Sequence, residues 1–115
     1  MDERLQKALD FSNYTATINN QKQNIKNRFE QLQLVHHAGG TFVANQQTIA
    51  FVKSMIDLGH TNGVLIDIRD NPVNIKSFQE LIEKLTDAYF SATTEYEAEY
   101  AKIRKSRNIK SMMDW

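Results

Sequence analysis

The clearest hydrophobic pattern of the chain lies in its last third. Apolar residues there alternate four and three positions apart, a spacing typical of a coiled-coil stripe along one face of a helix. The stripe comprises Phe78, Ile82, Leu85, Tyr89, Ala92, Tyr96 and, one heptad further, Ile103. It predicts a long helix over residues 78–108, in which these side chains form a helix-seam interaction surface. Ser77 and Glu80 have the spacing of a capping box at its start.

A second long helix is predicted at the start of the chain, over residues 1–35. No glycine or proline interrupts the segment from Arg4 to Leu34. Apolar residues recur in it every seven positions, at Phe11, Ile18, Ile25 and Leu32. Because this seam is narrow and the other faces are mostly polar, we expect one side to pack on a partner and the rest to face water. The outer part of the last helix is one candidate partner, and another copy of the chain is the other.

The segment between the helices, residues 36–77, predicts a small α/β body. Residues 41–44 indicate a short strand, and residues 46–58 indicate a helix with Asn45 as its N-cap and Gly59 as its stop. Residues 64–68 indicate a strand that turns and returns after Pro72. The predicted fold is therefore α+β, a single domain over residues 1–115. Two long, partly coiled-coil-like helices flank a small β-α-β-β body, and residues 109–115 form a tail.

The segment "LVHHAGGTFVAN", residues 34–45, carries two histidines and two glycines that could form a metal or phosphate site. Adjacent side chains diverge on both a helix and a strand, so His36 and His37 are poorly placed to share a metal ion. The glycines lack the lysine and the preceding strand of a phosphate-binding loop. We therefore predict a turn between the first helix and a strand, with the histidines at the helix end. No metal and no cofactor is predicted.

Composition narrows the classes of function further. The 115 residues contain 14 basic and 14 acidic side chains and no cysteine. The balanced charge provides no overall field to attract nucleic acid or an anionic membrane, and the lack of cysteine excludes disulfides and thiol catalysis. No apolar run has the length of a membrane span or a signal peptide. These features predict a soluble protein of an intracellular setting.

Acid–base chemistry is the remaining enzymatic possibility, through Asp67, Arg69 and Asp70. Strand alternation places Asp67 and Arg69 on one face, where an exposed ion pair on the wet side of a sheet is the simpler interpretation. The serines are not part of a nucleophile motif. No catalytic residue is predicted, and the chain is not expected to be an enzyme.

Five cations within nine residues form a basic patch near the C-terminal end: Lys102, Arg104, Lys105, Arg107 and Lys110. Such a patch can contact nucleic acid, but basic residues also favour helix C-termini for electrostatic reasons. Glutamates one or two turns earlier offset the charge. We therefore favour a solvated helix end, and nucleic acid is not the expected partner.

The final residues, "SMMDW", place three large apolar side chains together: Met112, Met113 and Trp115. Such a segment can dock into a pocket of a partner through its aromatic anchor. It can equally fold back on the helices of its own chain. The sequence leaves both interpretations open.

Four segments together resemble a family of small proteins in T-even-like myoviruses, including cyanophages, that is associated with head-assembly genes. These segments are "FSNYTATINNQKQNIKNRF", "HHAGGTFVANQQTIAFVKSMIDLG", "DNPVNI" and "YFSATTEYEAEYAKIRKSR". The resemblance covers nearly the whole chain. It implies a bacteriophage protein of the prohead core or another virion-assembly step, located in the host cytoplasm during infection or in the prohead or virion. It supplies no active-site residues.

The sequence thus leads to two hypotheses of different kinds. The first is a non-enzymatic scaffold-type assembly protein that associates through helix–helix contacts with itself or with other phage assembly proteins. The alternative is a regulatory adaptor that docks a transcription or replication partner through its C-terminal apolar tail.

Overall fold

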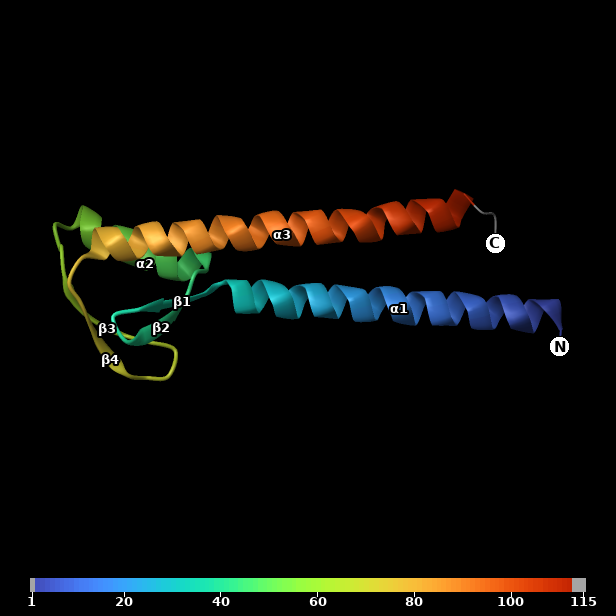
Figure 1. Cartoon of the computed structure of the whole chain (residues 1–115), viewed down its shortest axis with the longest axis horizontal. Helices are drawn as coiled ribbons and strands as arrows, with labels where there is room; N and C mark the ends of the chain where they lie inside the picture. Colours follow the sequence, from blue (N-terminus) through green and yellow to red (C-terminus); the bar gives the residue numbers. More distant parts are fainter. Residues whose placement is uncertain (1, 113–115) are drawn as a thin grey trace. The chain divides into compact units, whose positions relative to one another are not determined.

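The computed structural model describes the backbone of residues 2–112 and the side chains of residues 2–105 (Figure 1). Its elements are α1 (Glu3–Leu32), β1 (Leu34–His37), β2 (Gly40–Val43), α2 (Gln46–Asp57), β3 (Gly63–Ile66), β4 (Pro72–Ile75) and α3 (Phe78–Met112). The strands form two antiparallel sheets, β1 with β2 and β3 with β4. The α+β class and the two long helices are confirmed.

The first hairpin corrects the predicted start of the body. α1 ends at Leu32 rather than at residue 35, and the next residues form β1, so the order within the body is β-β-α-β-β. His36 and His37 lie on this strand, and their expected place at a helix end is wrong. The apolar pattern allows the helix to continue, but pairing with residues 40–43 overrides it. Pairing with the next segment of the chain is not visible in helical periodicity.

The double glycine does belong to a turn, but this turn joins two strands. The register pairs His37 with Gly40, which leaves a two-residue loop. Ala38 has φ 53° and Gly39 has φ 86°. Positive φ at both loop residues is the type I′ geometry, whose twist matches that of the flanking strands.

The predicted caps of the two later helices are confirmed. The Asn45 side chain accepts a hydrogen bond from the Thr48 N–H at 2.8 Å, and the Ser77 hydroxyl accepts one from the Glu80 N–H at 3.2 Å. Gly59 follows α2 with φ 93°, a conformation that glycine tolerates best. α3 continues to Met112 rather than ending at residue 108.

The chain divides into two compact units, and the first is an α/β unit over residues 30–93. Its core joins the inner faces of both hairpins to α2 and the first turns of α3. The buried core residues are Val35, Phe42, Ala44, Val52, Val73, Ile75, Phe78, Leu81 and Leu85. On the second hairpin, Val73 and Ile75 face this core and alternate with exposed Pro72 and Asn74. The core is thus built mainly from contacts between distant parts of the chain.

The second compact unit is helical and, among the described residues, combines residues 2–29 with residues 94–112. Within it, α1 and α3 lie side by side and antiparallel (Figure 1). Their contacts confirm the direction, because Arg28 reaches Glu95 whereas Lys22, earlier in α1, reaches Tyr100. The outer part of α3 is therefore paired with the first helix of the same chain, one of the two partners considered for it.

Candidate protein-interaction surfaces

The predicted helix seam is divided between the two units. Phe78 and Leu85 are buried in the core of the α/β unit, and Ile82 and Tyr89 pack against that core. Ile103 is buried in the helical unit. Tyr96 remains more than one third exposed. These side chains thus serve contacts within the chain, and their role in contacts with other proteins stays a prediction.

Aromatic rings hold the helical unit together alongside its aliphatic residues. Phe29 of α1 meets Tyr96 of α3 edge to face, with ring centroids 5.1 Å apart. Tyr96 stacks on Tyr100 at 5.9 Å, and the Lys22 ammonium lies 5.8 Å from the Tyr100 centroid. Such ring and cation–π contacts each contribute about 0.5–1.5 kcal/mol beyond burial. The helix pair therefore has a specific register in addition to a narrow apolar seam.

Two described residues of the basic patch, Lys102 and Arg104, are paired with acidic residues of their own helix. Lys102 donates to Glu99 at 2.8 Å, and this hydrogen bond and the charge of Glu99 raise the pKa of Lys102 above its ordinary value. Arg104 lies 3.6 Å from Glu97. Lys105 is exposed. Exposed pairs of this kind match the interpretation of a solvated helix end.

Several predicted site residues lie outside the part of the chain whose side chains the structure describes. Arg107, Lys110 and Met112 lie outside the residues whose side chains the structure describes, and Met113 and Trp115 lie outside the described residues altogether. The tail-docking prediction therefore stays a prediction.

An apolar ridge lies on the face of α1 that points away from its buried seam. Leu5 and Leu9 are one helical turn apart, and their exposed fractions are 53% and 43%. Leu9 lies nine residues before Ile18, which turns it to the opposite side of the helix at 100° per residue. Ile18 is buried within the helical unit. The helix thus has one apolar face that is buried at Ile18, although Phe11 on that face is 56% exposed, and one exposed apolar ridge on the opposite side.

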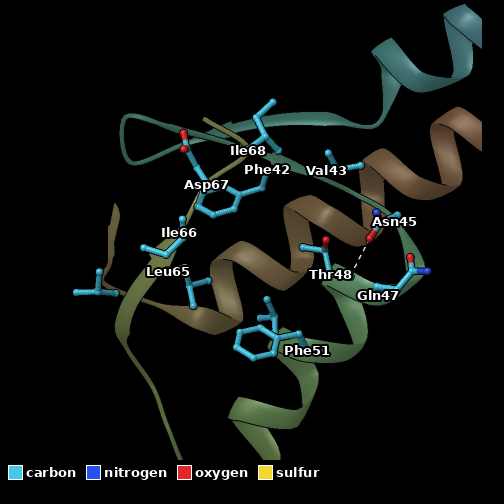
Figure 2. Close-up of a pocket in the computed structure, with 12 residues that line it drawn as sticks. Phe42, Val43, Asn45, Gln47, Thr48, Phe51, Leu65, Ile66, Asp67 and Ile68 are labelled. Atoms are coloured by element: carbon cyan, nitrogen blue, oxygen red, sulfur yellow. Dashed lines mark hydrogen bonds between the residues drawn. The ribbon is translucent and has the colours of Figure 1, made fainter. Parts of the chain in front are cut away.

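A groove of about 570 Å³ lies in the α/β unit between α2 and the two hairpins. It is lined by Phe42, Val43, Asn45, Gln47, Thr48, Phe51, Val52, Val64, Leu65, Ile66, Asp67 and Ile68. Figure 2 shows Leu65 and Ile66 of β3 on one side, Thr48 and Phe51 of α2 on the other, and Phe42 between them. The groove is therefore bordered by one helix and two strands.

Large apolar side chains remain exposed around this groove. The exposed fractions are 50% for Phe51, 63% for Val64, 62% for Ile66 and 48% for Ile68. Contiguous apolar surface of this kind marks interaction sites on folded proteins. The groove was not predicted from the sequence. The run "VLIDI", residues 64–68, does contain a signal, because it places apolar residues on both faces of a strand, and this indicates that the outward face also contacts apolar groups.

Asp67 closes one end of the groove and corrects a prediction. It is buried rather than part of an exposed ion pair with Arg69. One carboxylate oxygen accepts from the Arg69 and Asn71 N–H groups, both at 2.9 Å, and the other accepts from the Thr41 N–H at 3.0 Å. The hydrogen bonds from Asn71 and Thr41 outweigh burial and hold the pKa of Asp67 below its ordinary value. Asp67 thus joins the second hairpin to the first.

The histidine pair lies on opposite faces of β1 and has separate partners. His36 Nδ1 lies 3.0 Å from the Thr41 hydroxyl, and His37 Nδ1 lies 3.1 Å from the Lys84 ammonium. An ammonium can only donate, so the His37 nitrogen accepts in this contact. The two imidazoles therefore take part in two different structural contacts.

Among the side chains of residues 2–105, no group of three or more histidine, aspartate or glutamate residues converges as a metal site would require. None of the described helices is long and apolar enough to cross a membrane.

Comparison with known proteins adds no relative: no protein-family model, no curated protein and no solved structure matches the chain. The resemblance to virion-assembly proteins therefore stays a prediction from the sequence.

Proposed function

We propose that the chain is a non-enzymatic assembly protein of the prohead-core or scaffold type, which associates with other proteins through helix–helix contacts. The observation that supports this most directly is the exposed ridge of Leu5 and Leu9 on α1. The opposite face of the same helix is already paired with α3, so α1 can contact a further helix without releasing its present partner.

The apolar area of this ridge suits reversible association. Burial of apolar surface contributes about 25 cal/mol per Å², and two leucine side chains from each partner supply only part of a standard interface. Contacts of this size form at high protein concentration and dissociate at low concentration. This behaviour suits a component that must assemble and later be released. The seam within the chain meanwhile keeps each copy folded.

The test is the solution mass of the purified protein by light scattering over a wide range of concentration. We expect a mass that rises with concentration in the wild type and stays near the monomer in Leu9→Glu. Leu58→Glu is the matched control, because Leu58 is an exposed leucine at the end of α2, in the α/β unit. Its mass should follow the wild type.

A shortened chain that ends at Lys110 distinguishes the contribution of the ridge to association from that of the tail. Association in this shortened chain supports the helix-based proposal. Monomers at all concentrations in the wild type, or equal effects of Leu9→Glu and Leu58→Glu, would contradict it. Loss of association only in the shortened chain would instead favour the tail as the docking element.

A further inference from the structure

The groove of the α/β unit follows an open edge of β3. Asp67 donates its N–H to the Asn71 carbonyl at 3.0 Å, just beyond the paired residues Ile66 and Pro72. In an antiparallel pair, alternate residues direct both backbone groups toward the partner strand. Val64 and Ile66 are therefore the residues whose N–H and C=O groups point away from β4. Proline at position 72 fits this pattern, because its missing N–H belongs to the outward set as well.

The same argument applies to β2 on the other side of the groove. Ala44 donates to the Gln33 carbonyl, which places the backbone groups of Thr41 and Val43 on the edge away from β1. Thr41 uses this edge to contact the second hairpin, since its carbonyl accepts from the Ile68 N–H at 3.0 Å. The edge of β2 thus meets the turn that follows β3 at Thr41 and Ile68, and the edges of β2 and β3 separate beyond this contact. The groove lies where they separate.

The residues that line the groove also indicate that it runs along the edge of β3. Five consecutive residues, 64–68, take part in it. Successive side chains of a strand point to opposite faces, so a run of neighbours borders one cavity when that cavity runs along the edge of the strand. Backbone donors and acceptors of β3 therefore border the groove together with apolar side chains.

Charge further restricts what can enter. Asp67 is the one charged residue among those that line the groove, and its carboxylate already accepts three backbone N–H groups. The remaining lining is apolar, hydroxyl or amide. A charged side chain would lose its hydration here without gaining a partner, so charge complementarity selects an uncharged occupant.

We propose that this groove binds an extended, uncharged segment of another protein, which adds to the open edge of β3 through main-chain hydrogen bonds to Val64 and Ile66. This is the β-augmentation mode of recognition, in which the backbone provides affinity and pockets for alternate side chains provide specificity. Alternate side chains of the segment contact Phe42 and Phe51. β3 has four residues, so the bound segment spans about four to five residues. This site is separate from the α1 ridge and extends the proposed function.

The experiment begins with selection of a random twelve-residue peptide library against the full chain. The selected peptides are expected to be uncharged over four to five positions with apolar residues at every second one. A representative peptide is then N-methylated at alternate amides in two complementary versions. Methylation of the edge-facing amides should weaken binding at least about tenfold, whereas methylation of the other set should change it little.

Variants of the protein test the same contact from the other side. Ile66→Pro removes an outward N–H that β4 does not use, and Ile66→Val keeps it. We expect at least about a tenfold loss of affinity in the first and little change in the second. Phe51→Glu should also weaken binding. Phe90→Glu is the control and should not weaken binding, because Phe90 is a phenylalanine on α3 that is 61% exposed and does not line the groove.

The proposal is overturned if the library yields no binders that depend on Phe51, or if binders show helical spacing or charged cores. Equal affinity of the two N-methylated peptides would also overturn it, because the edge would then play no part. Leu9→Glu should leave peptide affinity unchanged. Its effect on mass and the effect of Phe51→Glu on peptide binding therefore report separately on the proposed function and on this site.

Discussion

At the scale of single residues, Asp67 has the largest structural role among the acidic side chains described. Three backbone N–H groups from two hairpins converge on its carboxylate, and its pKa is lowered as a result. A carboxyl group with a lower pKa in the folded state stabilises the fold above its ordinary pKa. This stabilisation is lost as the pH falls through the folded-state pKa.

We therefore expect Asp67→Asn to lower the thermal unfolding midpoint at pH 7 by roughly 5–10 °C, because an amide presents a donor to an N–H that needs an acceptor. The difference from wild type should persist at pH 5 and shrink as the pH falls below 4. Thermal unfolding at pH 7, 5, 4 and 3 measures it. Asp57→Asn, which removes an exposed pair with Lys53, should cost little at any pH. A pH-independent difference for Asp67→Asn would contradict the role of its charge.

Ala38 occupies a backbone conformation that suits asparagine better. Its φ of 53° precedes Gly39 at 86°, and Asn-Gly is the preferred pair for a type I′ turn. We expect Ala38→Asn to stabilise the protein by about 0.5–1 kcal/mol, measured by urea unfolding. Gly39→Ala should destabilise it, since φ is positive there as well. A neutral or destabilising effect of Ala38→Asn would show that the strain at this turn is relieved in another way.

At the scale of elements, the sequence predicted what depends on local chemistry. Asn45, Ser77 and Gly59 marked helix ends correctly, because a capping side chain or a left-handed glycine acts within a few residues. β1 was missed, because its four residues acquire strand geometry only by pairing with β2. The burial of Asp67 was missed for a different reason: its partner Thr41 is distant in the sequence.

The pairing of α1 with α3 can be tested through Ile103, which is buried and borders the same hollow as Ile25 of α1. Ile103→Ala removes three carbons from a packed site and should cost about 2–4 kcal/mol of local stability. We expect faster hydrogen exchange in the helical unit, while amides of the α/β core keep their protection. Lys26→Ala, at an exposed position of α1 outside the ridge of Leu5 and Leu9, is the control and should not change either set of amides. Uniformly faster exchange in both units would contradict their independence.

At the scale of the whole molecule, the groove could not be predicted, because Phe51 and Ile66 come together only when α2 and the second hairpin fold onto one core. The two-unit organisation could be predicted only in part. A single continuous stripe on α3 indicated one seam, but its first half packs in the α/β core and its last residue packs against α1. One helix thus supplies apolar contacts to two units, and periodicity alone does not show where one unit ends.

This organisation predicts that residues 30–93 fold without the rest of the chain. All buried residues of the α/β core lie inside this range, including Val52, Ile75 and Leu81. Domains of about 60 residues are marginally stable, so we expect cooperative unfolding at a lower midpoint than in the full chain. Methyl resonances of the core should keep their positions in the NMR spectrum.

Leu85→Ala provides the control for a native core in this fragment. The side chain is fully buried, and its truncation should cost about 3–5 kcal/mol, enough to unfold a marginal domain. A fragment that lacks dispersed resonances, or one that tolerates Leu85→Ala, would show that the core depends on residues 1–29 or 94–115. The helical unit would then support folding of the body, and exposure of its ridge for assembly would be coupled to the stability of the whole protein.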